Sequence, residues 1–220
     1  MTRHLLYYAR DSALFRTMVR ATMTALSPSK RLFIAVMPPA EIQERLAALV
    51  DLLAEHRAIL RPARSDGLHF TLRFLGDATP DEERRASEGC VAATAGVAAF
   101  PLVVGGFGIF PNARRPRVMW LGVCDGTAPL MALQRRVEDE LLRQGVIVSR
   151  ANVTPHLTLA RVRADASSAA QAALVADVAR LPAVEQAAMY VTGISLVQST
   201  LTPQGSTYTV RLTAPLARNA

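Results

Sequence analysis

Apolar positions from about residue 31 onwards form short runs and helical repeats that alternate along the chain. Residues 31–37 (RLFIAVM) are a continuous apolar run, which predicts a buried strand that ends before Pro38. Residues 68–75 (LHFTLRFL) alternate between apolar and polar side chains and predict a half-buried strand. Between these two segments, apolar residues recur at helical spacing and predict a helix: Ile42, Leu46, Leu49, Val50 and Leu53.

Three further helices follow from start signals and periodicity. Thr79 and Glu82 form a capping box with Pro at the first helical position, and this predicts a helix over 80–98. Apolar residues at helical spacing, closed by a glycine, predict a second helix over 130–145. The third helix is predicted over 168–181 and ends at a proline.

The remaining apolar segments predict strands that follow one another as hairpin pairs. They cover residues 101–107, 117–123, 156–162, 189–197 and 207–212. Helices and strands are interleaved, but the hairpins favour antiparallel pairing over the parallel sheet of a doubly wound fold. The sequence therefore predicts an α+β fold, with residues 31–220 as a single domain.

Residues 1–30 lack this periodicity and contain two internal methionines, Met18 and Met23. They carry five basic residues and one acidic residue, without the apolar stretch of a secretory signal. We interpret them as an N-terminal extension that is either disordered or lies upstream of the true start. A transit peptide is the alternative interpretation.

The net charge of +7 lies mainly in that extension, because the other 190 residues hold 20 basic and 17 acidic side chains. The predicted domain is therefore mildly basic, which permits an anionic substrate but is not typical of a dedicated nucleic-acid clamp. No apolar stretch approaches the roughly eighteen residues that a membrane-spanning helix needs. Cys90 and Cys124 fit no metal-ligand spacing, so we expect two buried thiols in a reducing, cytoplasmic compartment.

One motif occurs twice in the chain, as His69-Phe70-Thr71-Leu72 and His156-Leu157-Thr158-Leu159. Each copy begins a predicted strand, and residues two apart on a strand share a face. His69 and Thr71 should therefore project together, as should His156 and Thr158, while the apolar residues anchor each strand in the core. The repeat predicts two related lobes whose imidazoles and hydroxyls meet at a common surface.

Two imidazoles and two hydroxyls suit in-line displacement at phosphorus. One histidine can take a proton from water while the other protonates the departing ribose oxygen, since the imidazole pKa lies near neutrality. Threonine hydroxyls can donate hydrogen bonds to the non-bridging oxygens. One such motif would be typical of a structural histidine, but two matched copies favour catalysis. The remaining histidines, His4 and His56, are interpreted as non-catalytic, and we expect neither a metal nor another cofactor.

With both motifs in place, the chain resembles the 2H phosphoesterase superfamily, in particular the RNA 2′,3′-cyclic phosphodiesterases once called 2′-5′ RNA ligases. The similarity spans about residues 31–212 and includes LHFTLRFLGD, FGIFPNARRPRVMWLGV, TPHLTLARV and LVQSTLTPQGSTYTV. The resemblance implies a bilobal, pseudo-twofold fold with antiparallel sheets, flanking helices and both motifs in a central cleft. It also implies that His69 is the proton donor, that His156 is the proton acceptor, and that the product is an RNA 2′-phosphomonoester.

The resemblance implies two further substrate contacts, Arg161 near the phosphate and Phe110 stacked on a base. Strand alternation places Arg161 on the face opposite His156, and it places Arg73 on the same face as His69. Arg161 is a candidate substrate-binding residue through the resemblance, and Arg73 is a candidate through strand alternation.

Two other functions remain open from the sequence. One is reversible ligation or cleavage of 2′-5′ linkages, which would use the same residues in both directions. The other is a non-catalytic module that binds RNA ends, although a binder does not require a matched proton donor and acceptor. As partners of the protein we expect RNA ends or oligonucleotides with a 2′,3′-cyclic phosphate and no membrane, and we expect the protein to be a monomer. The near symmetry of the site leaves the acid and base labels to the resemblance alone.

Overall fold

The computed structural model describes residues 29–147, 154–178, 186–203 and 205–218. Its elements, in chain order, are β1 (Lys30–Val36), α2 (Ala40–Ala54), β2 (Leu60–Pro62), the 3₁₀ turn η1 (Ser65–Gly67), β3 (Phe70–Ala78), α3 (Pro80–Thr94), β4 (Phe100–Phe110), β5 (Val118–Asp125), α4 (Thr127–Arg143), β6 (Leu157–Val162), α5 (Ser168–Val178), β7 (Ala187–Val191), β8 (Gly193–Thr202) and β9 (Gly205–Pro215). The predictions for residues 1–28, His4 among them, lie outside the described residues.

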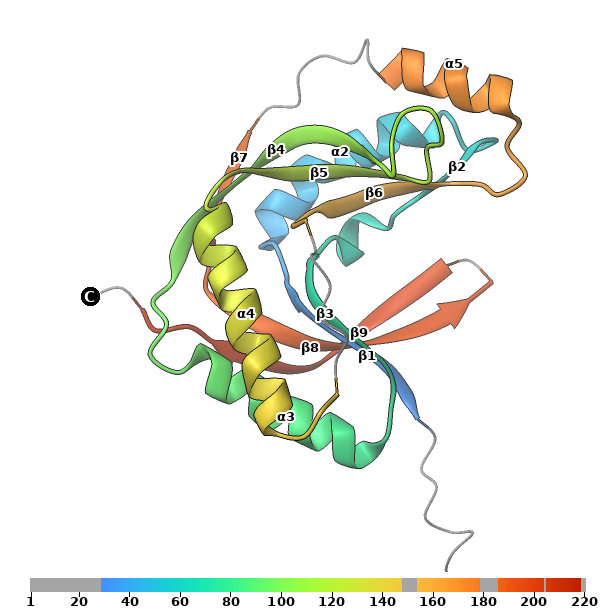
Figure 1. Cartoon of the computed structure of the whole chain (residues 1–220). Coiled ribbons are helices and arrows are strands. Elements are labelled where there is room, and N and C mark those ends of the chain that lie inside the picture. Colours follow the sequence, from blue (N-terminus) through green and yellow to red (C-terminus); the bar gives the residue numbers. More distant parts are fainter. Residues whose placement is uncertain (1–28, 148–153, 179–185, 204, 219–220) are drawn as a thin grey trace, which may run out of the picture.

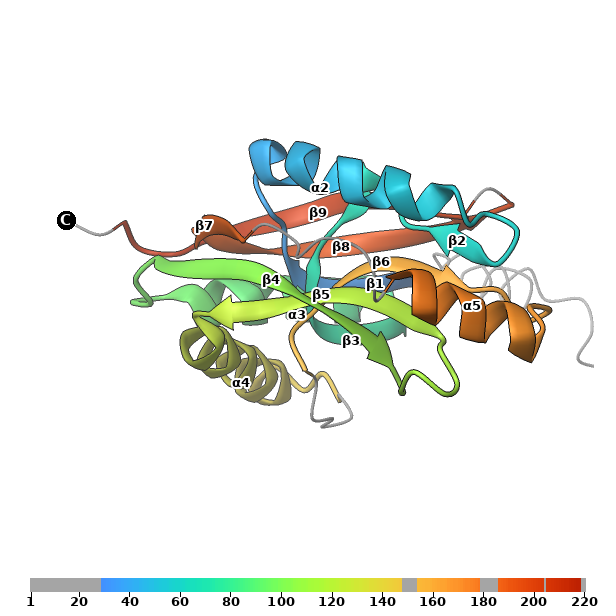
Figure 2. The same ribbon diagram turned by 90° about the horizontal axis from the view of Figure 1, so that it is seen from above.

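The strands form one antiparallel sheet in the order β7-β4-β5-β6-β3-β1-β8-β9, with β2 paired to β6. The sheet curls so that its two halves face each other (Figure 1). We call the half with β2, β4, β5, β6 and β7 the β6 lobe, which α2 and α5 flank (Figure 2). The half with β1, β3, β8 and β9 is the β3 lobe, covered on its outer side by α3 and α4. This arrangement confirms the predicted α+β fold with antiparallel strands.

Strand β1 divides its side chains between the two faces of the sheet. Leu32 and Ile34 are fully buried in the main core, on the side covered by α3. Phe33 and Ala35 point the other way and form a small separate cluster with Val197 of β8. We call the face that carries Phe33 and Ala35 the inner face. Because the sheet curls and its two halves face each other, side chains from both lobes can meet on the inner face.

Local signals in the sequence predicted most of the helices well. The buried positions of α2 are four of the predicted ones, and α3 begins at the predicted capping box of Thr79 and Glu82. Helix α3 ends at Thr94, earlier than expected. Among the helices of the described ranges, none is long and apolar enough to cross a membrane.

Two features of the sheet differ from the prediction. Residues 189–197 belong to two strands, because β7 ends beside β4 at Val191 and β8 begins beside β9 at Gly193. A Cβ at Gly193 would lie 2.8 Å from the carbonyl oxygen of Ala214, so this close approach requires glycine. Strand β2 was not predicted, since three residues that include a proline show no alternation.

The two cysteines have different environments. Cys90 of α3 is buried as expected, and burial raises the pKa of its thiol to about 12. Cys124 near the end of β5 is exposed, so the prediction that it is buried is wrong. Asp125 and Val123 pair with successive residues of β4, so Cys124 is the extra residue of a β-bulge, which strand periodicity does not predict.

Candidate active site

The two repeated motifs meet where the lobes join. Strands β3 and β6 pair through the residue that follows each motif histidine, Phe70 and Leu157, and both of these side chains are completely buried. Directly opposed residues in an antiparallel pair have Cβ atoms about 5 Å apart. Extending this register by one residue in each direction places each histidine opposite the threonine of the other motif: His69 opposite Thr158 and His156 opposite Thr71.

Neighbouring strands identify the face on which these side chains lie. Thr71 is opposite Ala35 of β1, which belongs to the inner face, and Thr158 is opposite Trp120 of β5. Both threonines are half-buried, whereas Phe70 between His69 and Thr71 points into the main core. The predicted sharing of a face within each motif is therefore present in the structure, and the pairing of β3 with β6 brings the two motifs together.

Both histidine rings are held in the same way. The Nδ1 atom of His69 lies 2.7 Å from the carbonyl oxygen of Gly67, and that of His156 lies 2.8 Å from the carbonyl oxygen of Thr154. A carbonyl oxygen only accepts hydrogen bonds, so Nδ1 carries the proton in each ring. In the neutral ring this leaves Nε2 with its lone pair available for proton transfer.

His69 is enclosed by aromatic rings of its own lobe. Phe33 stacks on it at 4.6 Å between centroids, and Tyr208 of β9 meets it edge-on at 5.1 Å. This burial lowers the pKa of His69, an effect that the hydrogen bond to the Gly67 carbonyl partly opposes. Positive charge on His156 and Arg161 lowers the pKa of His69 further, so side chains of the β6 lobe act electrostatically on it.

His156 has a different aromatic neighbour set, supplied by β4 and β5. Phe110 meets its ring edge-on at 5.0 Å, and Trp120 lies 6.1 Å away. Phe110 and Trp120 pack against each other at 4.7 Å, and the indole covers Gly108, where any Cβ would collide with it. Phe110 thus stands beside His156, while the stacking of Phe110 on a base stays a prediction.

A β-bulge explains where Arg73 points. Thr71 and Arg73 pair with successive residues of β1, so Leu72 is an extra residue in β3. The bulge interrupts strand alternation and turns Arg73 into the core, where it is only 5% exposed and forms an ion pair with Glu138 of α4. The prediction that Arg73 shares a face with His69 is therefore wrong.

An equivalent bulge in β6 has the opposite consequence for Arg161. Thr158 and Ala160 pair with successive residues of β5, so Leu159 is the extra residue, three positions after His156 as Leu72 is after His69. The bulge returns Arg161 to the face of Thr158, where it is exposed. Strict alternation had placed Arg161 on the opposite face; the structure places it on the inner face.

Sequence reasoning missed the residues that surround the histidines. Phe33, Tyr208 and Trp120 reach the site through long-range strand pairing, which no local sequence pattern indicates.

His56 lies in the turn after α2, where its backbone N–H donates a hydrogen bond to the Leu53 carbonyl. Within the described ranges, no group of three or more His, Cys, Asp or Glu side chains is placed to hold a metal ion.

Comparison with known proteins gives consistent matches. Residues 38–202 match the 2′-5′ RNA ligase superfamily. The RNA 2′,3′-cyclic phosphodiesterase of Methanothermobacter thermautotrophicus is 34% identical over 179 residues, which are 81% of this chain and 95% of that protein. The protein of the same name from Aeropyrum pernix is 33% identical over 74% of this chain and 90% of its own length.

Solved structures agree with these sequence matches. The crystal structure of E. coli LigT complexed with 3′-AMP has a TM-score of 0.66 at 27% identity, and it covers 86% of this chain and 99% of LigT. That of TT0787 from Thermus thermophilus has a TM-score of 0.64 at 28% identity, covering 84% of this chain and 97% of TT0787.

Proposed function

Because the chain belongs to the 2′-5′ RNA ligase superfamily, we propose that it hydrolyses RNA ends with a 2′,3′-cyclic phosphate to 2′-phosphomonoesters. The observation that carries the proposal is the pairing of Phe70 with Leu157, which brings both His-x-Thr motifs to the inner face. The names of the relatives from M. thermautotrophicus and A. pernix support the substrate and the reaction.

The proposed reaction is an in-line displacement with two proton transfers. The Nε2 of His156 takes a proton from water, whose oxygen attacks phosphorus. The bond from phosphorus to the ribose O3′ breaks, and the Nε2 of His69 donates its proton to that oxygen, which leaves a 3′-hydroxyl and a 2′-phosphate. The assignment of His69 as donor and His156 as acceptor follows the family resemblance.

The surroundings of the His69 ring affect its role as donor in two opposing ways. The reaction needs one imidazolium and one neutral imidazole, and two nearby rings disfavour simultaneous protonation. The lowered pKa of His69 makes its imidazolium a stronger acid toward the departing oxygen, although it reduces the protonated fraction near neutrality. Thr71 and Thr158 can donate hydrogen bonds to the non-bridging oxygens, and Arg161 can balance their charge.

The test is hydrolysis of an oligoribonucleotide that ends in a 2′,3′-cyclic phosphate, followed in the presence of EDTA. We expect a 2′-phosphate product from the wild type and a rate at least about 100-fold lower for His69→Ala and for His156→Ala. His56→Ala is the matched control and should retain full activity. Activity that persists without either motif histidine would contradict the proposed mechanism.

The same assay separates the competing functions. Binding of the substrate without turnover would favour an RNA-end-binding module. Attack of a 5′-hydroxyl RNA on the 2′,3′-cyclic phosphate, which breaks the bond to O3′ and leaves a 2′-5′ linkage, would favour the ligase direction. The expectation of a cytoplasmic monomer is part of this proposal. Light scattering of the purified protein tests the monomer, and cell fractionation tests the location.

A further inference from the structure

Strand β2 continues the edge of β6 beyond the point where β3 pairs with it. Residues 60–62 pair with 160–162, and the Ala63 amide donates to the Leu159 carbonyl at 2.7 Å. The chain then leaves β6 as η1 and returns at Phe70. Any side chain of β2 on the inner face therefore lies along the same strand edge as the two motifs.

Arg61 is that side chain. Leu60 beside it is completely buried, whereas Arg61 is exposed and directly opposite Arg161, which also lies on the inner face. Like charges directly opposite each other destabilise a strand pair. In the part of the chain that the structure describes, neither Arg61 nor Arg161 forms an ion pair with a carboxylate, so two positive charges meet there without neutralisation.

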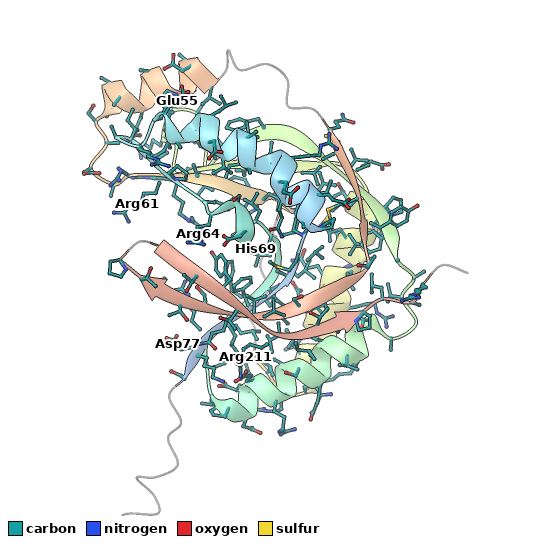
Figure 3. The ribbon with its side chains drawn as sticks, turned by 180° about the vertical axis from the view of Figure 1, so that it is seen from behind. Glu55, Arg61, Arg64, His69, Asp77 and Arg211 are labelled. Carbon is teal, nitrogen blue, oxygen red and sulfur yellow. The ribbon has the colours of Figure 1, made fainter. Side chains whose placement is uncertain are left out.

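Arg64 adds hydrogen-bond donors to this edge on the side of His69, while Asp66 balances its charge. Asp66 holds its guanidinium through two bonds, Nε to Oδ1 at 3.0 Å and Nη2 to Oδ2 at 2.7 Å. Two of five N–H donors point at this carboxylate, and three remain for another acceptor. Figure 3 shows Arg61 and Arg64 directed toward the β8–β9 hairpin, with His69 farther along the same side.

The spacing fits one nucleotide of RNA. Arg161 follows Thr158 by two register steps once the bulge is discounted, which is about 7 Å along the strand. Arg61 lies across from Arg161, about 5 Å away, on the same side of β6 as β3 and His69. A 2′,3′-cyclic phosphate closes the 3′ end of an RNA, so its nearest phosphodiester lies on the 5′ side, one nucleotide from the reacting phosphorus.

We propose that Arg61, aided by Arg64, forms a second anion site that binds the phosphodiester on the 5′ side of the reacting nucleotide. The site makes the protein selective for RNA ends over nucleoside 2′,3′-cyclic phosphates, which have no such group. This inference rests on the proposed function, because it assumes that the cyclic phosphate binds at His69 and His156.

The test compares two substrates on Arg61→Gln, with Arg57→Gln as a matched control from the turn before β2. One substrate is adenosine 2′,3′-cyclic phosphate, and the other is the dinucleotide ApA with the same cyclic end. We expect Arg61→Gln to raise KM for the dinucleotide about tenfold at unchanged kcat and to leave the mononucleotide unaffected. A neutral methylphosphonate linkage in the dinucleotide should abolish the difference between wild type and variant.

Other outcomes overturn the inference in distinguishable ways. Equal losses on both substrates would show that Arg61 acts on the fold or on the reacting phosphate, and no loss on either would show a solvated arginine pair only. If the wild type turns over neither substrate, the proposed function fails. In that case, calorimetric binding of ApA with a 2′-phosphate end still tests the site, since its affinity should fall about tenfold in Arg61→Gln and equal affinities would overturn it.

Discussion

The two His-x-Thr motifs share a backbone arrangement but differ in the side chains around their rings. Each ring donates from Nδ1 to the carbonyl two residues earlier, at 2.7 and 2.8 Å, and each strand bulges three residues after its histidine. His69 is enclosed by Phe33 and Tyr208, whereas His156 meets Phe110. The backbone therefore sets the direction of each ring, while burial among neighbouring side chains lowers the pKa of His69.

The residues after each bulge differ just as clearly. The first position beyond it points into the core and holds Arg73 in β3 but Ala160 in β6. The next position is exposed and holds Phe74 in β3 but Arg161 in β6. Equivalent positions therefore serve the fold in one lobe and carry charge to the inner face in the other, so the positive side of the site belongs to the β6 lobe.

The largest effect should come from the buried arginine, and it concerns stability. Arg73→Met leaves Glu138, whose side chain is 12% exposed, without its ionic partner. We expect a loss of about 3 kcal/mol in the free energy of unfolding, measured by urea denaturation. The double variant Arg73→Met with Glu138→Met should recover most of the loss. Equal stability of the single variant and the wild type would remove the proposed difference between Arg73 and Arg161.

Arg161 should matter for activity where Arg73 matters for folding. We expect Arg161→Gln to lower kcat/KM for a cyclic-phosphate RNA end about 100-fold, because it removes a charged donor from the phosphate. Phe74→Ala, at the equivalent exposed position of β3, is the control and should lower it far less. Comparable losses in the two variants would show that the lobes do not differ in this way.

The smallest effect should be a shift in the pH profile. The two histidines titrate as a pair, and the lower of the two steps gives the acidic limb of the rate profile, where the rate falls with decreasing pH, whichever ring is the donor. Because burial lowers the pKa of His69, this limb should lie below the ordinary histidine range. Tyr208→Ala exposes the ring to water and should move this limb to higher pH, toward the ordinary value. The control is Tyr190→Ala, a tyrosine of β7 that is 59% exposed, which should leave the limb in place. An unchanged limb in Tyr208→Ala would mean that this ring does not set the proton affinity of His69.

Local patterns in the sequence predicted most of the elements and the meeting of the two His-x-Thr motifs on one face, but not the directions of the two arginines. The histidine-threonine repeat and the capping box at Thr79 depend on neighbours in the chain, so they are visible in the sequence. The bulges depend on how β3 pairs with β1 and β6 with β5, and one extra residue reverses every later side chain. In β6 a local hint is the pair of consecutive apolar residues Leu159 and Ala160, which alternation does not allow, whereas Leu72 and Arg73 give no such hint in β3.

The aromatic enclosure of His69 was also beyond local reasoning. Tyr208 belongs to β9. This strand pairs with β8, and β8 pairs with β1. Its ring fits only because residue 67 is glycine, where a Cβ would lie 2.8 Å from the ring. Such contacts follow from the order of strands in the sheet and require the complete fold.

His69 and His156 should act as one unit on a single phosphate, and a double-mutant cycle tests this directly. The measurement is the single-turnover rate on a cyclic-phosphate RNA end for His69→Ala, His156→Ala and the variant with both changes. We expect the double variant to be no slower than the slower single variant, because losing either proton carrier already removes the concerted transfer. Losses that multiply in the double variant, or a single variant with the wild-type rate, would contradict the joint action of the two histidines.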